Sequence, residues 1–140
     1  MVHFVDATVL ISYVTKNFNY EKAKNIIENY RGQLVTGEHA KLELLSYYLI
    51  AYQNDENKAK DAVERTLKKC NVNVVTVSKE KIYDNVSAIQ EKLVLLNLDK
   101  LFHIATAQLL GAKKFFTFNR QLLLLKGLIK LYTGIEVTDR

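Results

Sequence analysis

The stretch LDKLFHIATAQLLGAKKFFTFNRQL (residues 98–122) predicts a helix, a strand and the start of a second helix. Its first half has the apolar spacing of an amphipathic helix, and Gly111 then supplies the left-handed residue that commonly ends a helix. The run KKFFTF (113–118) is a short apolar strand, and RQLLLLKGLIKLY (120–132) is helical again. A short apolar strand between two helices is typical of a parallel α/β sheet.

The same alternation extends along the rest of the chain. Short apolar runs at 2–5, 33–36 and 72–77 predict three more strands, and GIEVT (134–138) adds a fifth. Because parallel neighbours need long crossover connections, we expect an α/β fold with three layers, α/β/α, around a central parallel sheet of four or five strands. The 140 residues suffice for a single domain spanning residues 1–140.

The remaining segments have helical spacing. In the segment after the second strand, Leu42, Leu45, Leu49 and Tyr52 fall on one stripe, which we expect to be the buried face. Helices are expected over residues 8–17, 20–30, 37–53, 56–70, 79–96, 98–111 and 120–132.

Composition restricts the location and the partners of the protein. No run of about 18 apolar residues occurs, so we expect no membrane span. A single cysteine, Cys70, cannot form an internal disulfide, which fits the reducing cytoplasm. The net charge of +5 is compatible with binding RNA or DNA, although lysines scattered over helices equally describe a solvated surface.

Polar residues follow several of the expected strands. Ligands of parallel sheets bind beyond the carboxyl ends of the strands, where Asp6, Thr36, Thr117 and Asn119 lie, and Glu43 follows Thr36 by two helical turns. The sequence has no cysteine or histidine cluster with zinc spacing and no glycine-rich phosphate loop. Gathered carboxylates suit Mg²⁺ or Mn²⁺, because hard cations prefer oxygen ligands.

Each of these residues also has a simpler interpretation. Asp6 could cap the following helix, and Glu43 could be an ordinary polar position on an amphipathic helix. Asp99 suits a helix N-terminus, where the dipole favours an acid. His39 and His103 are expected in surface or hydrogen-bonded roles rather than in catalysis.

Three segments in order resemble the PIN domain, a family of small α/β metal-dependent ribonucleases that includes the VapC toxins. They are FVDATVLISYV (4–14), LVTGEHAKLELLSYYL (34–49) and the stretch at 98–122. The resemblance covers essentially the whole chain, and the last segment is its most specific part.

The resemblance implies a Mg²⁺- or Mn²⁺-dependent endoribonuclease that cleaves RNA. Asp6 and Glu43 would be catalytic metal ligands, Asn119 would assist in place of an acid, and Thr8 and Thr117 would position the substrate. The implied partners are RNA, a small antitoxin protein and a second copy in a homodimer, for which the leucine-rich segment 122–132 offers an interface.

Two positions depart from the family pattern. Lys100 aligns with the third acid and Asn119 with the fourth. Helical rotation places Lys100 on the apolar side of its helix, so we expect its ammonium to point inward and to pair with Asp6 and Glu43 where a cation would bind.

The sequence leaves two alternatives open. If Lys100 instead reaches solvent, Asp6 and Glu43 could still hold a weak metal with help from Asp99 or Asn119. If it does not, the chain is a catalytically inactive PIN module without a cofactor that acts in RNA binding or protein interaction. Whether the chain is an enzyme therefore depends on Lys100.

Overall fold

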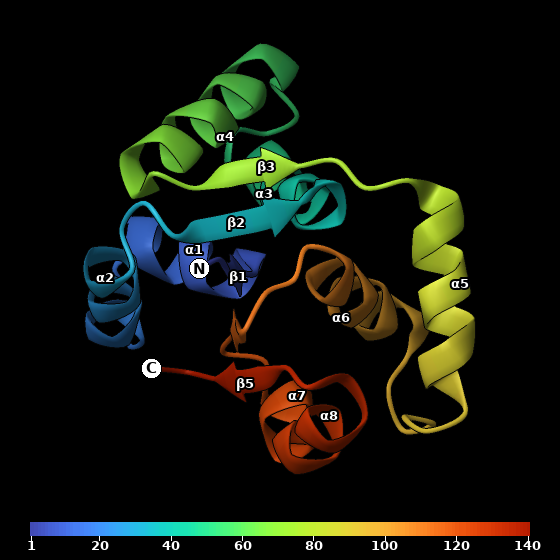
Figure 1. Cartoon of the computed structure of the whole chain (residues 1–140). Coiled ribbons are helices and arrows are strands. Elements are labelled where there is room, and N and C mark those ends of the chain that lie inside the picture. The colour runs from blue at the N-terminus through green and yellow to red at the C-terminus, as the bar shows by residue number, and fades with distance from the viewer.

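The computed structural model describes residues 1–140 and contains one parallel sheet (Figure 1). The strands follow the order β3-β2-β1-β4-β5, so the first strand of the chain lies at the centre. All four neighbouring pairs are parallel. The strands are β1 (His3–Val5), β2 (Leu34–Gly37), β3 (Asn73–Val75), β4 (Lys114–Phe116) and β5 (Glu136–Thr138).

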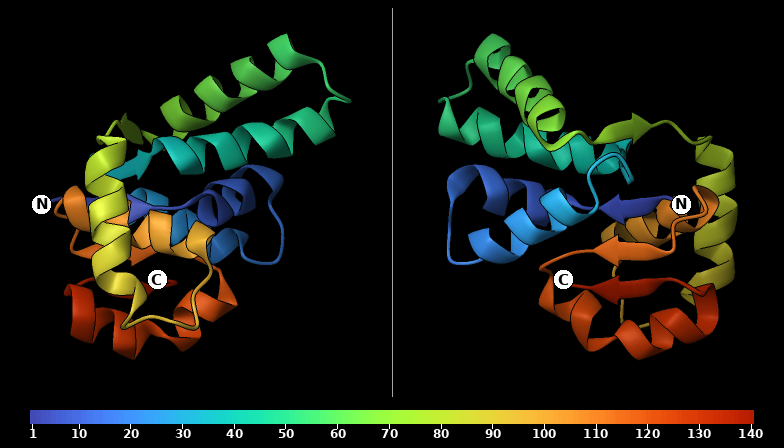
Figure 2. Two further views of the ribbon diagram at one scale, coloured as in Figure 1. Left: turned by 90° about the vertical axis from the view of Figure 1, so that its right-hand side faces the viewer. Right: turned by 60° about the vertical axis from the view of Figure 1, so that its left-hand side comes forward.

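Helices connect the strands and cover both faces of the sheet. Figure 1 shows α2 on one side of the strands and α5 and α6 on the other, and Figure 2 shows α3 and α4 as a pair that extends beyond the sheet. The predicted three-layer α/β/α fold is therefore confirmed. The helices are α1 (Ala7–Thr15), α2 (Tyr20–Asn29), α3 (Glu38–Ala51), α4 (Glu56–Cys70), α5 (Lys79–Gln90), α6 (Leu98–Leu109), α7 (Arg120–Leu124) and α8 (Lys126–Thr133).

Alternating strand side chains build two cores. Phe4 and Phe115 stack with their ring centroids 4.7 Å apart and belong to the core under α5 to α8. Val5 and Phe116, the next residue on each strand, belong to the core under α1, α2 and α4. A strand that is buried on both faces has no polar side to alternate, which explains the uniformly apolar strand sequences.

Most predicted elements are present, with three differences. The helix expected over 79–96 ends at Gln90, and the segment 120–132 divides into α7 and α8. The stripe expected to be buried on α3 is wrong, since Leu42 is 60% exposed. The buried residues of α3 are Ala40 and Leu44, because this helix lies between the two cores and contributes one residue to each.

A close approach at the end of β2 places α6 beside the sheet. A Cβ atom added to Gly37 would lie 2.9 Å from Cγ2 of Thr106 on α6, so glycine permits this packing. The contact holds the start of α3 beside the C-terminal half of α6. No helix of the chain is both long and apolar enough to span a membrane.

Candidate functional site

Asp6 is held rigidly at the carboxyl end of the central strand. It caps α1, since its Oδ1 accepts the backbone N–H of Thr8 at 3.0 Å, so the interpretation of Asp6 as a helix cap is correct. The hydroxyl of Thr8 also donates to Oδ1, and the hydroxyl of Thr117 donates to Oδ2, each at 2.5 Å. Two hydroxyl donors and one amide therefore fix both oxygens of this carboxylate.

The two threonines continue into a small network. The backbone N–H of Phe118 donates to the hydroxyl of Thr8, and that of Asn119 donates to the hydroxyl of Thr117, both at 2.9 Å. Thr117 is fully buried, and its hydroxyl orients the Asp6 carboxylate. Thr8 is only partly buried and still borders the site.

Burial dominates the electrostatics of Asp6. The loss of solvent raises the pKa of Asp6 above its usual value, although the hydrogen bonds from Thr117 and Thr8 and the nearby His103 act in the opposite direction. The carboxylate of Glu43 raises the pKa further. The charges of Glu43 on α3 and His103 on α6 thus both influence the Asp6 carboxylate, which follows β1.

Glu43 is bound to a buried histidine. Nε2 of His103 lies 2.7 Å from Oε1 of Glu43, and the His103 side chain is only 4% exposed. The edges of Phe4 and Phe115 pack around the imidazole ring. His103 is thus buried and in contact with a proposed metal ligand, which places this histidine beside the candidate site.

Lys100 does not pair with Asp6 or Glu43. Its Nζ lies 3.2 Å from Oδ2 of Asp99, the preceding residue, and the structure has no ion pair between Lys100 and Asp6 or Glu43. The expected inward pairing is therefore wrong. The neighbouring acid offers a partner at the same helix end, so the ammonium need not enter the buried pocket, which would cost its hydration.

Asp99 has a second partner on α3. Its Oδ1 is hydrogen-bonded to Nε2 of His39, whose side chain is 42% exposed. Burial by itself raises the pKa of Asp99, but the hydrogen bonds from His39 and Lys100 and the nearby His103 outweigh burial and lower the pKa below its usual value. Asp99 thus stays ionised, and besides stabilising the start of α6 it links this helix to His39 on α3.

Two other residues at or just beyond the ends of strands, Asn119 and Thr36, do not offer the site an open oxygen. Oδ1 of Asn119 accepts the backbone N–H of Leu122 at 3.0 Å and caps α7, so its carbonyl oxygen is occupied. Thr36 is fully buried, and its hydroxyl has no hydrogen-bond partner. Neither side chain adds an open ligand to the site.

The donor set at the site can be compared with what a divalent cation needs. Mg²⁺ usually binds through one or two carboxylates and keeps several waters, so Asp6 and Glu43 together satisfy its minimum requirement. The third and fourth acids of the family pattern are replaced by a lysine that turns to Asp99 and by an asparagine that caps a helix. Asp6 and Glu43 are therefore suited to bind a hard cation such as Mg²⁺, but only weakly.

Sequence reasoning missed a second group of potential ligands. His39, Glu43, Asp99 and His103 each offer one ligand atom, and these four atoms lie within 4.8 Å of one another. The sequence does contain a pattern that indicates this group. His39 and Glu43 are four residues apart, as are Asp99 and His103, so each pair lies on one face of its helix. Nothing in the sequence indicated that the two faces meet.

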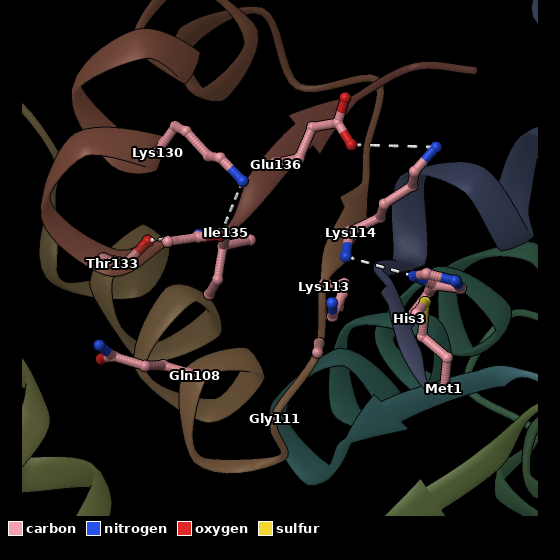
Figure 3. Close-up of a pocket in the computed structure, with 12 residues that line it drawn as sticks. Met1, His3, Gln108, Gly111, Lys113, Lys114, Lys130, Thr133, Ile135 and Glu136 are labelled. Atoms are coloured by element: carbon pink, nitrogen blue, oxygen red, sulfur yellow. Dashed lines mark hydrogen bonds and ion pairs between the residues drawn. The ribbon is translucent and has the colours of Figure 1, made fainter.

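Two cavities of the structure lie near the two ends of the sheet, and neither is lined by Asp6 or Glu43. One cavity of about 430 Å³ is formed at the opposite end of the sheet by His3, Lys114 and Glu136 with their neighbours (Figure 3). It contains no carboxylate cluster and lies at the amino ends of the strands. Another cavity, of about 310 Å³, borders His39 and Phe102 and is mostly apolar.

Comparisons with solved structures agree on the fold. A chain of a toxin–antitoxin complex from Klebsiella pneumoniae matches with a TM-score of 0.63 and 21% identity, over 84% of this chain and 86% of that one. A chain of VapBC2 from Rickettsia felis, bound to a promoter DNA fragment, matches with a TM-score of 0.69 and 10% identity, over 99% and 98% of the two chains. VapBC-1 from nontypeable Haemophilus influenzae gives 0.70 and 19%, with the same coverage.

The sequence comparisons assign the family. A comparison with curated protein sequences gives no match. Residues 3–128 match the PIN domain, which includes β1 with Asp6, α3 with Glu43 and the segment from α6 to α7. With this match over most of its length and the three-layer fold, the chain belongs to the PIN domain family.

Proposed function

We propose that the protein is a VapC-type nuclease that hydrolyses RNA phosphodiester bonds with a divalent cation. The observation that supports this proposal is the ion pair of Lys100 with Asp99, because it leaves Asp6 and Glu43 without an ammonium between them. The sequence alone had made that ammonium the main obstacle to metal binding.

The proposed roles follow from the contacts of each residue. Asp6 and Glu43 would hold Mg²⁺ or Mn²⁺, and the chemistry that such a cation supplies is activation of water and neutralisation of charge on the phosphodiester. Thr8 and Thr117 keep the Asp6 carboxylate in one orientation, and His103 does the same for Glu43. Preorganisation of this kind avoids the cost of ordering the ligands during the reaction.

A second candidate function is an inactive PIN module that binds RNA or protein. It is favoured by the buried state of Asp6, whose raised pKa disfavours the charge that a metal needs, and by the capping role of Asn119. The net charge of +5 supports RNA as a ligand in both cases. If the inactive module binds RNA, the two candidates differ in whether the bound RNA is cut.

The proposed protein partners are a small antitoxin and a second copy of this chain. The structures with this fold include toxin–antitoxin complexes, which supports the antitoxin. The helices α7 and α8 expose four large apolar side chains, which supports a homodimer: Leu124, Leu128, Leu131 and Tyr132. We infer a cytoplasmic location, where RNA is available and the lone Cys70 stays reduced.

The test is cleavage of single-stranded RNA by the purified chain with Mg²⁺ or Mn²⁺. Cleavage should require the metal, stop with a chelator and disappear in Asp6→Asn, while Asp84→Asn, an exposed carboxylate on α5, should cleave like the parent. RNA binding without cleavage at any metal concentration would contradict the nuclease and favour the inactive module.

A further inference from the structure

A cluster of two histidines and two acids lies beside the pocket of Asp6. We propose that His39, Glu43, Asp99 and His103 form a transition-metal site that binds Zn²⁺. This inference goes beyond the proposed function, since it concerns a different donor set and does not require hydrolysis. It shares only Glu43 with the pair proposed to hold Mg²⁺ or Mn²⁺.

The site is built from two matched pairs on two helices. His39 and Glu43 are four residues apart on α3, and Asp99 and His103 are four residues apart on α6. Residues with this spacing lie on the same face of a helix, one turn apart. Each pair therefore presents one imidazole and one carboxylate to the other helix.

Cross-helix contacts bring the pairs together. His39 on α3 is hydrogen-bonded to Asp99 on α6, and His103 on α6 lies 2.7 Å from Glu43 on α3. The two imidazole rings have centroids 4.9 Å apart. All four ligand atoms thus lie within 4.8 Å of one another.

The dimensions suit a tetrahedral ion. Ligand atoms about 2.0–2.2 Å from zinc in a tetrahedron lie roughly 3.4 Å from one another. The cluster approaches this spacing, so small side-chain rotations would suffice to enclose an ion. Imidazole nitrogen and carboxylate oxygen are both ligands that Zn²⁺ accepts.

The donor types distinguish this site from the pocket of Asp6. An ion bound at the cluster would replace the cross-helix contacts of His39 with Asp99 and of His103 with Glu43 by coordination to imidazole nitrogens and carboxylate oxygens. Zn²⁺ binds imidazole well, whereas Mg²⁺ prefers oxygen ligands and dehydrates reluctantly. Asp6 is not a member of the group, and its two oxygens are held by Thr8 and Thr117.

The surroundings support the ligands. Lys100 contacts Oδ2 of Asp99 and leaves Oδ1 directed at the cluster, which is how an outer partner commonly orients a ligating carboxylate. His103 is fixed by burial between aromatic side chains, while the partly exposed His39 leaves a route of entry. The lysine that replaces the third family acid thus has a place in this site.

The test is calorimetric titration of the metal-stripped full chain with ZnCl₂, and separately with MgCl₂. We expect one Zn²⁺ per chain, and Mg²⁺ binding weaker by roughly 100-fold or more. Co²⁺ in place of Zn²⁺ should give the intense visible absorption of a tetrahedral site. His39→Gln and Asp99→Asn change partly exposed side chains, so they should fold normally. Each removes a direct ligand and should weaken Zn²⁺ binding by at least about 10-fold, the lower end of the loss seen when only an outer partner of a ligand is changed.

Two controls separate this proposal from the nuclease. Asp84→Asn removes an equal charge outside the cluster and should bind Zn²⁺ like the parent. Asp6→Asn should abolish RNA cleavage and leave Zn²⁺ binding unchanged, so either proposal can fail alone. Zinc binding that is unaffected by His39→Gln and Asp99→Asn, or that is lost in Asp6→Asn, would overturn the site.

Discussion

The ammonium of Lys100 lies 3.2 Å from Oδ2 of Asp99, and the two residues are adjacent in the chain. A lysine at the position of a family acid has therefore been compensated by the acid that precedes it. The pair keeps a positive charge away from Asp6 and Glu43, and it leaves the site with two carboxylates in place of four acids.

Restoring the third acid should strengthen binding of a hard cation. In Lys100→Asp a carboxylate replaces an ammonium at the edge of the pocket, so the affinity for Mg²⁺ should rise and added Mg²⁺ should raise the melting temperature more than in the parent. Thermal unfolding across a Mg²⁺ titration measures both effects.

Lys100→Met is the matched control, because it removes the positive charge without adding an acid. It should give a Mg²⁺ response between those of the parent and Lys100→Asp. An equal response in both variants would show that the charge of Lys100 matters and that the position of the third carboxylate does not.

Replacing Asp6 should separate stability from activity. Asn keeps the helix-capping oxygen and removes a charge whose burial is unfavourable, so Asp6→Asn should unfold at a temperature equal to or above that of the parent at pH 7 while losing RNA cleavage. Such an exchange is typical of residues that are kept for chemistry rather than for folding.

The stability difference between Asp6→Asn and the parent should depend on pH in a defined direction. The pKa of Asp6 is raised in the folded state, so the folded protein binds the proton more tightly than the unfolded chain does. The unfavourable contribution is fully present above the raised pKa and disappears as the pH falls from there toward the unfolded value of 3.8. Urea unfolding of parent and variant should converge over that range, and a constant difference would contradict the raised pKa.

Gly37 should be essential for the packing of α6 against β2. In Gly37→Ala the new methyl group would lie 2.9 Å from Cγ2 of Thr106, whose hydroxyl is bonded to the carbonyl of Phe102 and cannot rotate freely. Overpacking of this kind costs about 1–3 kcal/mol of unfolding free energy. Urea denaturation with an unchanged slope would measure the loss.

Gly127 provides the comparison for this substitution. It lies in α8, and a Cβ atom there would contact nothing within 4 Å. Gly127→Ala should therefore not destabilise the protein and should gain up to about 1 kcal/mol from helix propensity. Equal losses in both variants would mean that the contact with Thr106 is not the cause.

The sequence was sufficient for the sheet but not for the faces of the helices. Strands buried on both sides are short and apolar, so β1, β2 and β4 were located to within two residues, and Gly111 has the left-handed φ of +69° expected after α6. The buried side of α3 was wrong because it depends on where two cores meet, which periodicity within one helix does not specify.

The part of the site that depends on the sheet was predictable from the sequence, whereas the part that depends on helix packing was not. Asp6 follows the central strand, and its place is fixed by the order of the strands. The contact between His39 and Asp99 joins residues separated by 60 positions and depends on how α3 and α6 cross. The direction of Lys100 depended on the competition between two carboxylate partners, which helical rotation alone does not resolve.

The exposed apolar side chains of α7 and α8 should mediate the proposed homodimer. Leu131 is 70% exposed, and Leu124, Leu128 and Tyr132 are exposed on the same two helices. In Leu131→Lys a charge would have to be buried in the interface, so the dimer should dissociate at concentrations where the parent is dimeric, without loss of monomer stability. Light scattering after size-exclusion chromatography measures the mass directly.

Leu42→Lys is the control for this prediction. Leu42 is also a leucine that is mostly exposed, at 60%, but it lies on α3, away from α7 and α8. Its substitution changes the charge and the exposed apolar area of the monomer by the same amount, so the dimer should persist. A parent that stays monomeric at every concentration, or a dimer that both substitutions dissociate equally, would contradict an interface at α7 and α8.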